Sequence, residues 1–111
     1  MARQPQVLDY TSGTVSDSAV TILGMGSALV TSPPIGARCF VGTVESAALR
    51  ARGDGTSPTA SEGQLVASGD VLYLSESEFS SMEFIRDTST DVEIRGHFYN
   101  VEVDVILGKV T

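Results

Sequence analysis

Histidine and cysteine, the residue types that most often carry catalysis, occur once each among the 111 residues, as His97 and Cys39. A cysteine nucleophile needs a base beside it, and a zinc site needs several nitrogen or sulfur ligands. Cys39 lies in the run Arg-Cys-Phe-Val, which favours a buried thiol in a strand, since free cysteine behaves as a small hydrophobic side chain. His97 is expected on a strand, facing solvent or an interface. We therefore predict no catalytic residue, no metal site and no cofactor.

Paired carboxylates are the other candidate chemistry, and they occur at Glu76/Glu78, Asp87/Asp91 and Glu102/Asp104. Glycoside hydrolysis needs two carboxylates held across a cleft at a set separation. Alternate residues of a strand point to the same side, so such pairs are typical of a solvated strand face. The chain also has no tryptophan, and only 6% of its residues are aromatic, which leaves little to stack on a sugar ring. The prediction is that this protein is not an enzyme.

The tripeptide Arg52-Gly53-Asp54 matches the sequence that integrins bind. It is followed by Gly55, and Gly-Asp-Gly is ordinary turn chemistry, because glycine adopts positive φ without steric cost. We interpret this segment as a turn between two strands.

The charge balance is acidic, with 7 Lys and Arg against 14 Asp and Glu, a net charge of −7. Nucleic-acid binding depends on Lys and Arg that meet phosphates, and an anionic membrane surface attracts the same residues. We therefore expect neither nucleic acid nor a membrane as a partner. No apolar stretch resembles a signal peptide or a membrane span, so we expect the chain to be made in a reducing cytoplasm.

Turn signals interrupt the chain every 8 to 12 residues, and β-branched residues are frequent. This spacing is typical of an all-β domain, and a jelly-roll-like or Greek-key sandwich of about eight short strands is the predicted fold. One helical turn is expected at 75–81. The strand candidates are 19–23, 28–30, 38–44, 47–52, 63–67, 70–74, 82–86, 91–99 and a half-buried final strand at 101–106.

The chain is predicted to consist of an extended N-terminal arm at 1–18 and a single sandwich domain at 19–111. The arm is polar except for a few apolar residues that could anchor it on a neighbouring molecule. The loop around two consecutive prolines is stiff and partly apolar. The candidate partner contacts are Val7, Leu8 and Tyr10 in the arm and Pro33, Pro34 and Ile35 in the loop.

A series of short motifs follows the expected Arg-Ala-Arg strand end at 50–52. The turn reads Asp-Gly-Thr-Ser-Pro-Thr at 54–59, a Ser-Gly-Asp turn comes at 68–70, and Phe-Ile-Arg at 84–86 precedes a strand that ends in Phe98-Tyr99. In this order the motifs resemble small virion structural proteins of tailed bacteriophages. The resemblance covers about 38–99, its most specific element is 54–59, and it departs from the pattern at Gly53, where a bulkier residue is expected.

The resemblance implies a capsid decoration, or cement, protein on the surface of the phage head, often a homotrimer with a jelly-roll-like core. Its partner would be the major capsid protein or another virion protein. The alternative is a receptor- or carbohydrate-binding module of a tail fibre or tip, for which exposed Tyr10, Phe79 and Tyr99 are the candidate contacts.

Overall fold

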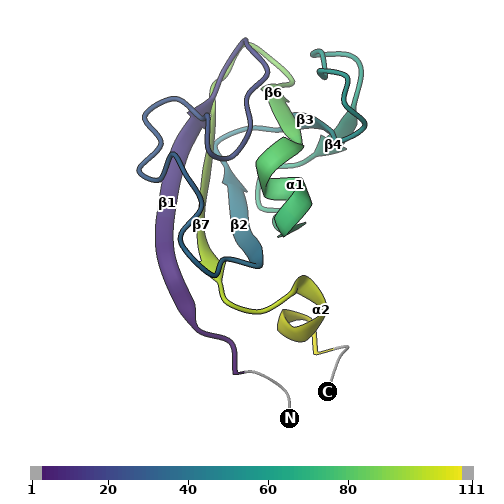
Figure 1. The fold of residues 1–111 in the computed structure, drawn as a ribbon. Helices are drawn as coiled ribbons and strands as arrows, with labels where there is room; N and C mark the ends of the chain where they lie inside the picture. The colour runs from purple at the N-terminus through teal and green to yellow at the C-terminus, as the bar shows by residue number, and fades with distance from the viewer. Residues whose placement is uncertain (1–3, 109–111) are drawn as a thin grey trace.

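The computed structural model describes residues 4–108 and contains two antiparallel sheets. One sheet has four strands in the order β1-β7-β2-β5, and the other has three in the order β4-β3-β6. The predicted all-β sandwich is confirmed, with seven strands (Figure 1). The elements are β1 (Val7–Val15), β2 (Cys39–Glu45), β3 (Leu49–Arg52), β4 (Gln64–Val66), β5 (Val71–Ser75), α1 (Glu76–Ser81), β6 (Glu83–Arg86), β7 (Val92–Tyr99) and α2 (Val103–Ile106).

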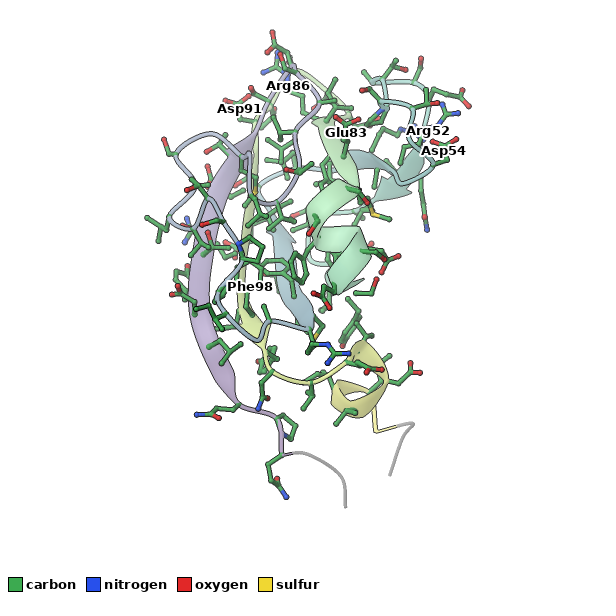
Figure 2. All side chains as sticks on the ribbon, viewed as in Figure 1. Arg52, Asp54, Glu83, Arg86, Asp91 and Phe98 are labelled. Carbon is green, nitrogen blue, oxygen red and sulfur yellow. The ribbon has the colours of Figure 1, made fainter. Side chains whose placement is uncertain are left out.

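The core lies between the sheets and contains all four phenylalanines of the chain, each fully buried. Phe98 of β7 is central (Figure 2): its ring centroid lies 5.1 Å from that of Phe40 and 5.3 Å from that of Phe79. Phe79 comes from α1, so this short helix packs against the inner side of the four-stranded sheet. The burial of Phe98 follows from the alternation of side chains along β7, because Val92, Ile94, Gly96 and Phe98 are buried while the residues between them are not.

The helical turn expected at 75–81 is confirmed as α1. Ser75 is its N-cap: its hydroxyl accepts a hydrogen bond from the backbone N–H of Glu78, while the Glu78 carboxylate accepts one from the Ser75 N–H. This reciprocal capping box satisfies two backbone donors that the helix itself cannot pair. It also turns the chain sharply from β5 towards β6.

The predicted arm at 1–18 differs from the structure, because residues 7–15 form β1 and pair with β7 along its length. Thr11, Gly13 and Val15 face the core and are buried. The segment reads as polar because it supplies mostly small and hydroxyl side chains. Threonine and serine are compatible with a strand whose apolar contacts come from its neighbours.

The strands predicted at 19–23 and 28–30 are wrong: both segments belong to the long connection between β1 and β2. Their contacts with the sheets are isolated: Val20 forms a single bridge with Phe84, the Leu29 N–H donates to Ser12 O, and the Val30 N–H donates to the Thr11 hydroxyl. Ser27 has φ of 56°, a left-handed conformation that interrupts an extended chain. The apolar residues there, Ile22 and Met25, are buried because the connection folds over the end of the core.

The final strand predicted at 101–106 is also wrong, because residues 103–106 form the short helix α2. β7 already has β1 on one side and β2 on the other, so the chain after Tyr99 has no vacant edge beside it. Its backbone groups are paired locally instead: the N–H of Val105 donates to Glu102 O at 3.0 Å, and that of Leu107 to Val103 O at 2.9 Å. The alternating valines therefore do not mark a strand here.

Candidate protein-binding face

The outer side of the four-stranded sheet collects the aromatic side chains that are not in the core. It carries all three tyrosines of the chain and its single histidine. Tyr10 in β1 is paired with His97 in β7, His97 with Val41 in β2, and Val41 with Tyr73 in β5, so one row crosses all four strands. We define the aromatic face as Tyr10, Val41, Val71, Tyr73, His97 and Tyr99.

Three of the four rings of the aromatic face form a chain of contacts, and all four are at least partly exposed. The Tyr10 and His97 ring centroids are 5.2 Å apart, and those of His97 and Tyr99 are 6.4 Å apart. Tyr10 is 41% exposed and Tyr73 is 42% exposed. A shallow hollow of about 320 Å³ lies over the centre of the face, between Tyr10, Val41, Val71, His97 and Tyr99. Tyrosine suits such a place, because its ring offers contact area while its hydroxyl stays hydrated.

One end of the face is polar. Arg95 lies 3.8 Å from the Glu45 carboxylate, both side chains being about half exposed, and the Thr14 hydroxyl donates to Glu93 at 2.8 Å. Exposed ion pairs contribute little to stability. Their effect is to place carboxylates beside the aromatic residues, so the face has an apolar centre and an acidic end.

Cys39 lies on the same side of β2 as Val41 by alternation, but it is fully buried. The segment after β7 covers this end of the sheet: Val101 is buried and α2 packs against β5. Burial raises the pKa of the Cys39 thiol from 9.0 to about 11. The thiol is therefore neutral at physiological pH and cannot act as a nucleophile, in agreement with the predicted structural role.

This pKa predicts a loss of stability in alkaline solution. The unfolded chain releases the thiol proton near pH 9 and the folded protein only near pH 11, so stability falls as the pH rises between these values. At about 1.4 kcal/mol per unit, the expected loss is about 2 to 3 kcal/mol. Urea denaturation of the wild type and of Cys39→Ala at about pH 8 and pH 11 isolates the effect. Equal losses in the two proteins would contradict it.

The carboxylate pairs noted in the sequence do not form joint sites, because one or both members of each pair are engaged in ion pairs with arginines. Asp87 binds Arg50 at 2.9 Å, and Asp91 binds Arg86 at 2.7 Å. In the cleft of about 630 Å³ between α1 and α2, Arg38 stands between Glu76 and Glu102 and pairs with both. Among residues 4–108, no group of three or more histidine, cysteine or acidic side chains is placed to hold a metal ion.

The Arg52-Gly53-Asp54 segment forms an exposed turn in which its two charges bind each other (Figure 2). The Arg52 guanidinium donates to both carboxylate oxygens of Asp54, at 2.8 and 3.1 Å. These hydrogen bonds, with one from the Thr56 N–H, hold the pKa of Asp54 below its usual value. An arginine and an aspartate paired in this way do not present free charges to a receptor, which favours the structural interpretation of the motif.

The predicted partner contacts are divided between two places. Tyr10 belongs to the aromatic face; Val7, paired with Tyr99, is 51% exposed, and Leu8 is half-buried against the core. Pro33, Pro34 and Ile35 lie in the connection before β2, where the Ala37 N–H donates to Pro34 O and closes a turn. Ile35 at the corner of this turn is 100% exposed. Of the residues proposed for a carbohydrate site, Phe79 is excluded because it is buried in the core.

The sequence interpretation missed Val41, Val71 and Tyr73, whereas Tyr10 and Tyr99 were named as candidate contacts and His97 was expected to face solvent or an interface. The only signal was the alternation of 70–74 and 91–99, which puts tyrosine on the side opposite the buried residues.

No family model, curated protein or solved structure matches this chain. The functional assignment therefore rests on the geometry of the aromatic face and on the motifs at 50–99. Neither described helix has the length and apolar character that crossing a membrane requires.

Proposed function

We propose that this protein is a non-enzymatic structural protein of a tailed-bacteriophage virion, a decoration protein that binds assembled capsid subunits through its aromatic face. The observation that supports this is the segregation of aromatic residues: four phenylalanines in the core and three tyrosines on one open sheet face. Tyrosine is enriched at protein interfaces. A protein that exposes its tyrosines together has a surface suited to partners.

The ring geometry favours a protein partner over a sugar. The His97 ring is tilted by 56° to Tyr10 and by 58° to Tyr99, so neither pair of rings forms a flat platform. An oligosaccharide that stacks on several rings at once needs them coplanar, whereas the side chains of a protein surface can fill the hollow between tilted rings. The carbohydrate-binding alternative predicts signal on a glycan array, and the decoration proposal predicts none.

Decoration would stabilise the head by mass action. A protein that binds the assembled lattice and not free subunits adds RT ln(1 + [L]/Kd) per site to the stability of the lattice. Many copies at symmetric joints multiply a modest affinity per copy. We include the homotrimer in the proposal, because three-fold joints recur across a capsid, and light scattering over a range of dilutions tests it. A stable trimer is expected, and a monomer at all concentrations would remove this part of the proposal.

The deciding experiment is co-sedimentation with heads assembled without this protein from the capsid protein of the same phage. Saturable binding, with a raised melting temperature of the head, is the expected result. Heads that sediment without the protein at all concentrations, at low and at high salt, would refute decoration.

A further inference from the structure

The two sheets end side by side at β4 and β5, and a groove of about 390 Å³ separates these two strands. Its walls include Leu65 and Val66 on one side and Val71 and Tyr73 on the other, with Met82 among the remaining lining residues. Each of the two strands has a neighbour on one side only. The backbone groups on their other sides face the groove.

The pairing of β5 identifies which of its groups are free. Val44 N–H donates to Asp70 O at 3.0 Å, so hydrogen-bonded positions alternate from there: Leu72 and Leu74 bond to β2. The N–H and C=O groups of Val71 and Tyr73 therefore point away from β2. Within residues 4–108, they have no hydrogen-bond partner.

The same reasoning applies to β4. The backbone of Phe84 exchanges two hydrogen bonds with that of Val20, at 2.7 and 2.9 Å, so the N–H and C=O of Phe84 point away from β3. By alternation, the backbone groups of Arg50 point towards Ile85 in β6. Those of Leu49 and Ala51 point the other way, towards Val66 and Gln64 in β4. The N–H and C=O of Leu65 consequently point away from β3. Both walls of the groove thus present unpaired backbone donors and acceptors.

The edge of β6 is covered, and that of β1 is covered over part of its length. Along β1, Thr14 exchanges hydrogen bonds with Gly26, Ser12 O accepts from the Leu29 N–H, and the Tyr10 N–H donates to the Asp9 carboxylate at 2.9 Å. Along β6, Val20 pairs with Phe84. Natural proteins usually block edge strands in such ways, since an open edge pairs with other chains. The open edges at β4 and β5 are the exception.

We propose that an extended segment of a partner protein adds as a strand to the free edge of β5, within this groove. Unpaired N–H and C=O groups in strand spacing are complementary to another extended backbone, which binds such an edge by adding as a strand. β5 has five residues, so the segment has about four or five. Alternate side chains would point inward beside Leu72 and Leu74, which requires apolar residues there.

The charge of the protein indicates which residue types suit the outward-facing positions of the segment. The chain has a net charge of −7, and the described residues that line the groove include Asp70 and Glu78 but no lysine or arginine. The outward side chains of the segment are therefore expected to be basic or neutral. A second copy of this chain is the alternative occupant, and a dependence of the protection on protein concentration would reveal it. The groove adjoins the aromatic face, because Val71 and Tyr73 of β5 belong to both, but the inference rests on backbone groups and holds for any partner, virion or other.

The test uses the full chain and two synthetic peptides, an acetylated and amidated Lys-Val-Lys-Val-Lys-Val and the same peptide with N-methyl groups along one edge. We expect the first peptide to protect the Val71 and Tyr73 amides from hydrogen exchange and the second not to. In the free protein these amides should exchange fast, while those of Leu72 and Leu74 are slow.

Two protein variants separate the loss of the Val71 N–H donor from the loss of side-chain volume. Val71 is the first residue of β5, where proline is tolerated, so Val71→Pro deletes the free N–H and Val71→Ala keeps it. We expect peptide affinity to fall at least about 10-fold in Val71→Pro and to stay within about 2-fold in Val71→Ala. If Val71→Pro melts far below the wild type, the hydrogen-exchange comparison of the two peptides on the wild-type protein decides.

Three results would overturn the proposal. The first is protection of the Val71 and Tyr73 amides in dilute free protein, and the second is no peptide binding up to about 1 mM. The third is protection that grows with protein concentration, which would assign the edge to a second copy. Failure of capsid binding alone leaves the strand-addition result unchanged, so the two proposals fail separately.

Discussion

Gly96→Ala is expected to destabilise the fold by about 3 kcal/mol or more, although it adds a single methyl group. Gly96 in β7 lies opposite Gly42 in β2, and its Cβ would collide with Val41 O and Gly42 Cα and come within 2.7 Å of the Phe40 ring. The first two are backbone atoms and cannot rotate away. The Phe40 ring is fully buried against Phe98, so it cannot retreat either.

Thermal unfolding followed by circular dichroism measures this effect. For a domain of this size the expected decrease in Tm is about 12 °C or more. Gly26→Ala is the matched control, because the nearest atom to its Cβ is Thr14 O at 3.4 Å, an ordinary contact, and it is expected to melt near the wild type. A Gly96→Ala protein that melts within about 2 °C of the wild type would show that β2 and β7 are less closely joined than described.

The double substitution Tyr10→Ala with Tyr73→Ala is expected to weaken binding to undecorated heads about 100-fold. The two tyrosines stand at opposite ends of the row that crosses the sheet, so both halves of the aromatic face lose their largest exposed ring. Loss of an aromatic anchor typically costs 1 to 2 kcal/mol or more, and about 2.7 kcal/mol corresponds to 100-fold. Co-sedimentation titrations of the wild type and the variant give the ratio.

Two controls make this result specific. The double variant should keep the Tm of the wild type within a few degrees, since both side chains are substantially exposed. Leu29→Ala removes an apolar side chain that is 65% exposed and lies outside the aromatic face, and it should bind as the wild type does. If Leu29→Ala weakens binding as much as the double variant, the partner does not bind at the aromatic face.

The same sheet uses its two sides for different purposes. On the inner side, paired glycines let β2 and β7 lie beneath the Phe40 ring, and this close fit allows little substitution. On the outer side, the rings are separated by a hollow and by solvent, so substitutions there are tolerated by the fold. Stability and binding can therefore be altered independently, which is why the two predictions above are separable.

Side-chain alternation and turn residues within single segments were sufficient to predict most of the strands. The alternation of 92–99, the turn residues around Gly55 and Gly69, and the Ser75–Glu78 capping box each act over a few residues, so each could be predicted from sequence. The buried state of Cys39 followed from its apolar neighbours in the same way. These features depend on hydrogen bonds and side-chain directions within a single segment.

The tertiary structure alone decided which strands are neighbours. A period of two shows which residues share one side of a strand, but the row from Tyr10 to Tyr73 exists only because the strand order is β1-β7-β2-β5. The same order gave β1 its place in the sheet despite its polar residues, and it enclosed β7 between β1 and β2, so 101–106 could not pair beside β7 and α2 formed. Pairing between distant segments depends on the packing of the whole core, and no single segment contains that information.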